Sequence, residues 1–454
     1  MPDRTTASDS FIEAACVPLD SGHGAGTLDH AQAILAEHPE VGSHSIHTAA
    51  ILGDDAAVRR FLEIDPSNAT AKGGPRGWDA LTHLCFSRYL RLDRARSAGF
   101  VRAATALLDA GASANTGWFE KDHQPSPEWE SALYGAAGVA HHAELTRLLL
   151  ERGADPNDGE TPYHAPETYD SGAIAVLVES GKLTDGSLAT MLLRKADWHD
   201  FDGIRFLLER GADPNYLTGW RLTALHQALR RDNALKIIEA MLDHRADPTL
   251  RDGNGRSAVS IAARRGRADV LAVFGRRGIP DALEGVERLL AACARDDAPA
   301  IRAMADREPE LVRELLTQGG TLLAEFAGTG NVDGVARLLD LGVRVDAVFA
   351  EGDGYWGVAP RSLAIHVAAW RLQHAVVRLL IDRGSPVEVP DGRGRTPLML
   401  AVRACVDSHW TGMRAPDAVR ALLDAGASVQ DVVYPSGYAD VDALLGAHGA
   451  KRTS

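Results

Sequence analysis

The sequence is poor in the features that mark secreted, disulfide-rich and membrane proteins. Its four cysteines, Cys16, Cys85, Cys293 and Cys405, lie far apart and show neither a zinc-binding spacing nor a disulfide framework. No run of about eighteen apolar residues could span a bilayer, and residues 1–16 lack the basic and apolar regions of a secretory signal. We therefore expect a soluble protein of the reducing cytoplasm, with no membrane partner.

Basic charge and catalytic signatures are also scarce. The chain has 48 lysines and arginines against 62 acidic residues, a net charge of −14 that repels phosphate backbones. Nucleic acid is therefore not an expected partner, whereas a basic segment of a protein would be attracted. No HExxH, GxSxG, paired CxxC or Walker sequence is present, so we expect no metal and no cofactor. The glycine-rich stretch GHGAG at residues 22–26 follows no strand pattern, and we interpret it as a linker.

What the chain does contain is a repeated phrase. Residues 148–157 read LLLERGADPN and residues 206–215 read FLLERGADPN, and variants recur along the sequence. Gly211 to Arg245 is 34 residues and Arg245 to Gly278 is 33, so the underlying period is about 33 residues, with insertions. Paired leucines are typical of a helix end, a following glycine adopts the left-handed conformation that caps it, and Asp, Pro and Asn favour a turn.

A second phrase opens the units. It reads TALHQA at residues 223–228, SAVSIA at 257–262, TPLMLA at 396–401 and SALYGA at 131–136. Thr or Ser is a preferred residue before the first helical turn, and Pro suits the first helical position. Each unit is therefore predicted to hold two short antiparallel helices.

These two phrases, recurring in phase, resemble the ankyrin repeat. The resemblance covers about twelve units from residue 10 to residue 430, several of them degenerate. It implies an all-α solenoid of antiparallel helix pairs with finger-like turns and a concave groove. We expect a degenerate N-terminal capping repeat at residues 1–41 and ankyrin repeats at residues 42–281, with a long finger at 116–130. Degenerate ankyrin repeats should follow at residues 282–346, and ankyrin repeats with insertions at residues 347–430. Residues 431–454 should form a C-terminal capping helix and tail.

Departures from the bare repeat are where we expect function. Residues 116–130 and 347–361 lengthen two fingers, and residues 87–99 and 406–416 lengthen connections between paired helices. The fingers hold many of the aromatic residues of a chain that is only 6% aromatic, and aromatic side chains are enriched at binding hot spots. The alternative is that they only fill the fingers. The candidate binding residues are Trp78, Trp118, Phe119, Trp129, Tyr163, Tyr169, Trp220, Tyr355 and Trp356.

The unit that begins TPYHAP at Thr161 is unusual because Pro166 disfavours continuation of its first helix. A shortened helix would open a notch beside polar residues. If the protein is an enzyme, the candidate catalytic residues are His164, Glu130, Asp79 and His83, because a carboxylate beside an imidazole can transfer protons. The competing interpretation is that His164, His226 and His366 are structural hydrogen-bonders, as the corresponding histidine of ankyrin repeats usually is.

Three functions follow from these patterns. The first is an ankyrin-repeat scaffold that binds a protein or peptide through its concave groove and aromatic fingers. The second is a metal-free small-molecule-binding protein or enzyme, an acid/base isomerase, cyclase or hydrolase, with a pocket near repeats three to five. The third is a purely structural stack that joins partners through its ends, which the long aromatic fingers disfavour. We favour the first, because the family consists mainly of interaction modules and no catalytic signature is present.

Overall fold

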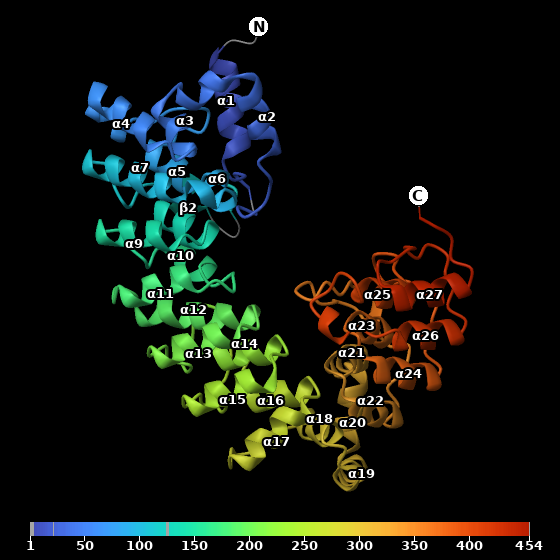
Figure 1. Cartoon of the computed structure of the whole chain (residues 1–454). Coiled ribbons are helices and arrows are strands. Elements are labelled where there is room, and N and C mark those ends of the chain that lie inside the picture. Colours follow the sequence, from blue (N-terminus) through green and yellow to red (C-terminus); the bar gives the residue numbers. More distant parts are fainter. Residues whose placement is uncertain (1–3, 21, 124–126, 454) are drawn as a thin grey trace. The chain divides into compact units, whose positions relative to one another are not determined.

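The computed structural model describes residues 4–20, 22–123 and 127–453, and almost all of its regular structure is helical (Figure 1). The chain forms two compact units, unit 1 (Met1–Asp247) and unit 2 (Pro248–Ser454). Residues 1–3 and 21 of the expected N-terminal repeat, 124–126 of the long finger and 454 of the tail lie outside the described residues.

Unit 1 consists of consecutive short helices and one β-hairpin (Figure 1). Its elements are α1 (Arg4–Ala15), α2 (Asp29–Glu37), η1 (Pro39–Ser43), α3 (Ile46–Ile51), α4 (Asp55–Ile64), η2 (Pro66–Ala69), α5 (Ala80–Cys85), α6 (Arg88–Leu92), η3 (Arg94–Arg96), α7 (Ser97–Asp109), β1 (Gly117–Glu120), β2 (Glu128–Ser131), α8 (Ala132–Tyr134), η4 (Gly135–Val139), α9 (Ala143–Glu151), α10 (Glu160–His164), α11 (Gly172–Glu179), α12 (Asp185–Asp197), α13 (Phe201–Glu209), α14 (Ala224–Arg230) and α15 (Leu235–Asp243).

Unit 2 has the same construction, with one shorter strand pair. Its elements are α16 (Ala258–Arg264), α17 (Ala268–Arg276), α18 (Val286–Ala294), α19 (Ala298–Arg307), α20 (Pro309–Thr317), α21 (Gly319–Thr329), α22 (Val332–Asp340), β3 (Val348–Phe349), β4 (Ser362–Leu363), α23 (Ala364–Trp370), α24 (His374–Asp382), α25 (Pro397–Ala404), η5 (Thr411–Met413), α26 (Asp417–Asp424) and α27 (Ala439–Ala447).

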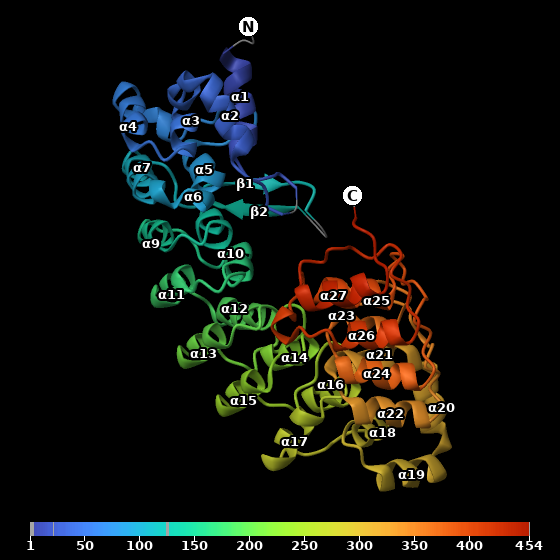
Figure 2. The same ribbon diagram turned by 45° about the vertical axis from the view of Figure 1, so that its right-hand side comes forward.

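Helices of one repeat pack on the equivalent helices of the next. In unit 1, α3 packs on α5, α10 on α12 and α12 on α14, while α4, α7, α9 and α11 form the second row. In unit 2, α21, α23 and α25 form one row and α22, α24 and α26 the other. Both rows run through each unit in Figures 1 and 2. This packing confirms the expected all-α helical-repeat fold. The rows form because each amphipathic helix pair buries its apolar face against the neighbouring pair.

The repeated phrase forms the helix end that its residues predict. Gly211 follows α13 with φ of +90°, and Arg245 adopts φ of +68° at the corresponding place without glycine. The asparagine that ends the phrase binds the next turn: Asn215 donates from Nδ2 to the Arg245 carbonyl at 2.9 Å, and its Oδ1 accepts from the Asp247 amide at 2.6 Å. Asn157 bridges to the following turn in the same way. The phrase recurs because it joins consecutive turns as well as ending a helix.

The second phrase caps helix starts. The side chains of Thr223, Ser257 and Thr396 each accept a hydrogen bond from the backbone three residues later, at the starts of α14, α16 and α25. The predicted short helix is also present: α10 has five residues and ends at His164, two residues before Pro166.

Both long fingers contain an antiparallel strand pair. Strands β1 and β2 pair Gly117 with Ser131 and Glu120 with Glu128, while Val348 pairs with Leu363 in the shorter β3–β4 ribbon. Figure 2 shows the β1–β2 hairpin beside α5 and α6. This hairpin positions the candidate site of unit 1.

Candidate functional site

Unit 1 contains a cavity of about 520 Å³, called the inner cavity below. It is lined by the loop that holds His23, by both strands of the hairpin, and by α8, η4 and α10. Its titratable lining residues are His23, Arg91, Arg94, Glu120, His123, Glu130, Tyr134, His141, Glu160, His164 and Glu167. Such a concentration of ionisable groups in one concave site is typical of functional sites.

Strand alternation directs two carboxylates into this cavity. Trp118 and Glu120 are two residues apart on β1, and both are buried, whereas Phe119 between them is exposed. Glu130 lies directly opposite Trp118 on β2 and shares its buried face, while Trp129 is exposed opposite Phe119. Because side chains alternate along a strand, the hairpin presents carboxylates inward and an aromatic pair outward.

Glu130 is the most deeply buried of these carboxyl groups, with 1% of its surface exposed. Burial, followed by the nearby charges of Glu160 and Glu120, raises its pKa to about 8. Its Oε2 has no hydrogen-bond partner among the described residues. The ionised carboxylate is therefore poorly compensated by the protein around it.

His164 lies between two carboxylates. Its Nε2 is 3.0 Å from Glu160 Oε2, and its Nδ1 is 3.0 Å from Glu167 Oε2. Burial alone would lower the pKa of His164, but the two hydrogen bonds and the carboxylate charges outweigh burial and raise this pKa to about 9. Arg194 of α12 also pairs with Glu167. His164 is consequently an imidazolium at neutral pH, unlike a histidine that only braces its own helix.

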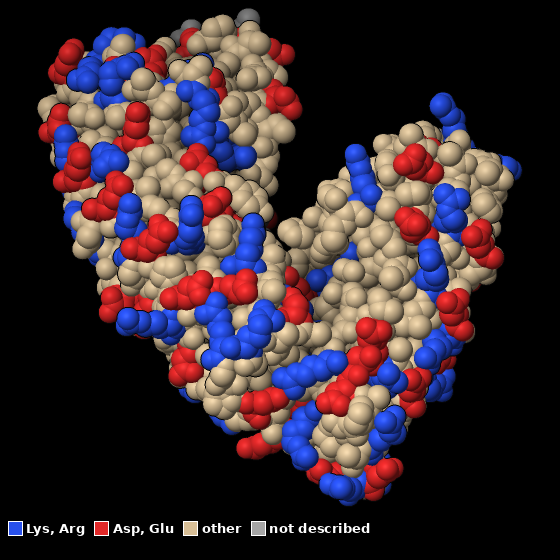
Figure 3. All heavy atoms as spheres, turned by 60° about the horizontal axis from the view of Figure 1, so that its bottom comes forward, with Lys and Arg blue, Asp and Glu red and all other residues tan. Residues whose placement is uncertain are grey.

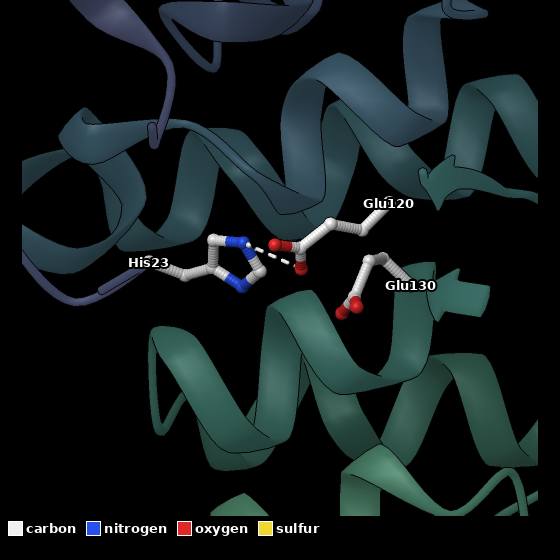
Figure 4. Close-up of side chains that lie close together, drawn as sticks. All are labelled: His23, Glu120 and Glu130. Atoms are coloured by element: carbon white, nitrogen blue, oxygen red, sulfur yellow. Dashed lines mark ion pairs between the residues drawn. The ribbon is translucent and has the colours of Figure 1, made fainter. Parts of the chain in front are cut away.

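His23 enters the cavity from the loop that follows α1. Its Nδ1 lies 2.8 Å from the Tyr134 hydroxyl, and its Nε2 lies 3.4 Å from Glu120 Oε2 (Figure 4). Burial, and then the positive charge of His164, lowers the pKa of His23 to about 4. His23 is therefore a neutral imidazole at pH 7, buried beside two carboxylates.

A second, more open pocket of about 670 Å³ adjoins the inner cavity and is called the outer pocket below. The two share Glu160 and His164, and the outer pocket also contains Glu128, Tyr163 and Trp220. Trp220 is 52% exposed and its ring lies 5.5 Å from that of Tyr163. Arg194 stacks over Tyr163 at 4.0 Å. An exposed tryptophan, a braced tyrosine and two carboxylates thus border one open pocket.

The aromatic residues predicted for binding divide into a buried and an exposed group. Trp78 and Trp118 pack against each other at 5.1 Å in the core of unit 1, and Trp356 packs on Trp410 at 4.6 Å in unit 2. Those that remain exposed are Phe119, Trp129, Tyr169, Trp220 and Tyr355, and Tyr163 is half-buried. Only the exposed group and Tyr163 present a surface to a partner.

The four candidate catalytic residues do not all meet. Glu130 and His164 line the inner cavity, but Asp79 and His83 are not among its lining residues. Asp79 caps α5 by accepting from the Thr82 amide, and the fully buried His83 contacts the Asp79 carbonyl through Nδ1 at 2.9 Å. Asp79 and His83 therefore stabilise the start of α5 and do not line the inner cavity.

Sequence reasoning missed His23, Glu120 and Glu160. His23 lies in the stretch interpreted as a linker, and only the folded chain brings it to a hairpin about one hundred residues away. Glu120 could have been found from the alternation of Trp118, Phe119 and Glu120, had that stretch been interpreted as a strand. Glu160 precedes the TPYH phrase and carries no signal in the sequence.

Two protein-family models match segments of this chain. A model described as ankyrin repeats (many copies) matches residues 207–262, and the single ankyrin-repeat model matches residues 393–433. The chain is an ankyrin-repeat protein. The matched segments lie in α13 to α16 and in α25 to α26, where the two repeated phrases are complete.

Ankyrin-repeat proteins also occur among similar solved structures. One is the crystal structure of the ankyrin repeat domain of Bcl-3, a member of the IkappaB protein family, at 18% identity over 51% of this chain and 97% of that chain, with a TM-score of 0.22. Family membership rests on the two matched segments and on the stacked helix pairs. No helix in the described part of this ankyrin-repeat protein is long and apolar enough to cross a membrane.

Proposed function

We propose that this protein is a binding scaffold that holds a basic segment of a protein partner at the outer pocket of unit 1. Ankyrin repeats are generally protein-protein interaction modules. The observation that carries the proposal is the position of the half-exposed Trp220 on a pocket that also contains Glu128 and Glu160. A large exposed aromatic residue beside carboxylates suits an arginine or lysine side chain, which can stack on the ring and pair with the acids.

The charge of the protein supports a basic partner. The net charge is −14, yet acidic and basic side chains are interspersed over the face drawn in Figure 3. Attraction would therefore depend on the local carboxylates of the pocket and on the overall negative charge, rather than on one continuous acidic patch. Both contributions weaken as salt is added.

Co-purification of the full chain from its own cells tests this scaffold function. We expect a protein partner to be retained by the wild type and reduced at least about tenfold by Trp220→Ala, because buried aromatic anchors dominate interface energies. Tyr355→Ala, which removes an exposed aromatic residue of unit 2, is the matched control and should retain the partner. Equal retention by wild type and Trp220→Ala would refute a role for this surface.

A second candidate function is small-molecule binding, with acid/base chemistry, in the inner cavity. It is favoured by the raised pKa values of Glu130, about 8, and His164, about 9, in one concave site. Small-molecule mass spectrometry of gently isolated protein tests it. A compound released by the wild type and missing from the Glu130→Gln, His164→Ala double variant would support the function, and identical spectra would exclude it.

We also propose a cytoplasmic location. The four cysteines are buried and unpaired, as is common in proteins that fold in a reducing compartment.

A further inference from the structure

Three buried side chains in the inner cavity bring potential metal-binding atoms together. One ligand atom each from His23, Glu120 and Glu130 lies within 4.8 Å of the other two, and all three residues are buried (Figure 4). They come from the loop after α1 and from both strands of the hairpin. Residues far apart in the sequence therefore converge on one small volume.

Ionic partners are distributed unequally in the cavity. Glu160 and Glu167 are paired with His164, and Glu167 is also paired with Arg194. Within the described part of the chain, Glu120 and Glu130 form no ion pair with lysine or arginine, and the only ion-pair contact of Glu120 is with His23. Two neighbouring buried carboxylates without a cation are costly, because each loses hydration and repels the other.

Two buried atoms of this cluster lack a hydrogen-bond partner, and a cation could contact both of them. Glu130 Oε2 and His23 Nε2 are buried and have no hydrogen-bond partner among the described residues, and Glu130 and His23 are only 1% and 8% exposed. In Figure 4 the His23 ring and both carboxylates face the same space. Buried nitrogen and carboxylate oxygen atoms that converge and lack partners are an arrangement that a cation can satisfy.

The second ring nitrogen of His23 has a hydrogen-bond partner, as is usual for a histidine that binds a metal. Its Nδ1 lies 2.8 Å from the Tyr134 hydroxyl, so that hydrogen bond can fix the ring orientation while Nε2 faces the carboxylates. Metal-bound histidines usually have such a partner on the second ring nitrogen.

We propose that His23, Glu120 and Glu130 bind one divalent transition-metal ion that joins the N-terminal loop to the β1–β2 hairpin. One imidazole and two carboxylates suit Zn²⁺, Mn²⁺ or Fe²⁺. Metal–ligand bonds of about 2.0–2.2 Å place ligand atoms roughly 3–3.5 Å apart, and His23 Nε2 is already 3.4 Å from Glu120 Oε2. Glu130 needs only a small side-chain movement, and three protein ligands leave positions for water or a ligand from the cavity.

Zinc titration of the full chain, stripped with chelator and followed by calorimetry, tests the site. We expect one Zn²⁺ per chain, and an affinity lowered about 100-fold in Glu130→Gln and in His23→Asn, because each variant loses one of three ligands. His23→Asn keeps an amide near the position of Nδ1. The matched control is Glu128→Gln, a carboxylate on the same strand outside the three-residue cluster, whose zinc affinity should stay within about twofold of the wild type.

A second measurement separates loss of the site from loss of the fold. Glu130→Gln keeps the shape of the side chain and removes a buried ionisable group whose charged form the surrounding protein does not stabilise, so the metal-free variant should melt no lower than the metal-free wild type. Zinc should raise the melting temperature of the wild type and of Glu128→Gln, but not that of Glu130→Gln. No stoichiometric zinc binding by the wild type, or equal affinity in wild type and Glu130→Gln, would overturn the proposal.

Discussion

At the scale of single residues, equivalent repeat positions carry histidines with different roles. His226 contacts the Thr223 hydroxyl at 2.9 Å through Nδ1, and His366 accepts a hydrogen bond from the Leu363 amide at 2.9 Å, so both brace the start of their own helix. The corresponding His164 instead pairs with Glu160 and Glu167. The shared position in the repeat determines where the histidine lies, and the neighbouring residues determine its charge.

We therefore expect His164 to titrate near pH 9, whereas His83, whose pKa burial and nearby His47 lower to about 3, should stay neutral from pH 5 to 10. The folded-state pKa of His164 is above the unfolded value of about 6.5, so its stabilising contribution is full below that value and disappears as the pH rises through about 9. NMR titration of the histidine ring signals measures both pKa values.

The same pairing predicts a pH-dependent cost for His164→Gln. The variant should be less stable than the wild type by about 1–3 kcal/mol at pH 6, and the difference should shrink above pH 9. Denaturant unfolding at several pH values provides the measurement. A difference that is constant from pH 6 to pH 10 would show that the histidine acts through packing alone.

At the scale of elements, the sequence predicted the position of the β1–β2 hairpin as an insertion but not its strand structure. The insertion at residues 116–130 and its aromatic content were evident, but a finger of unknown conformation does not reveal which side chains face inward. Once β1 and β2 pair, alternation buries Trp118 with Glu120 and exposes Phe119 with Trp129. The helix ends and caps were predictable because their signals are local, whereas the meeting of His23 with the hairpin is a long-range contact without a local signal.

Close backbone approach within the hairpin makes Gly117 sensitive to substitution. A Cβ atom at this position would lie 2.2 Å from the Glu130 carbonyl oxygen. Gly117→Ala should therefore force the strands apart and destabilise unit 1 by about 1–3 kcal/mol. The matched control is Gly219→Ala, because a Cβ atom there meets no described atom within 4 Å. Thermal unfolding of both variants checks this, and an equal loss of stability in the two would contradict it.

At the scale of the whole molecule, each repeat is stabilised mainly by its neighbours, and the chain forms two compact units. Leu149 of α9 and Leu380 of α24 are both fully buried, one in each unit. Truncation of either to alanine should cost about 2–5 kcal/mol. Because contacts in a repeat protein are local, we expect Leu149→Ala to accelerate amide hydrogen exchange in α7, α9 and α11, and Leu380→Ala to do so in α22, α24 and α26.

Hydrogen exchange followed by mass spectrometry compares the two leucine variants directly. Faster exchange confined to the unit that carries the substitution supports local cooperativity. The same acceleration throughout both units in each variant would show instead that the chain unfolds as one cooperative body.

The most direct test of the account is selection of a random peptide library on the immobilised full chain. The scaffold proposal predicts enriched peptides rich in arginine or lysine, with affinity that falls as salt increases. Trp220→Ala and Glu128→Gln should each weaken these peptides about tenfold, whereas Tyr355→Ala should leave them unchanged. Failure to enrich any sequence, enrichment of peptides without basic residues, or equal binding by wild type and Trp220→Ala would contradict a basic-segment binding site at the outer pocket.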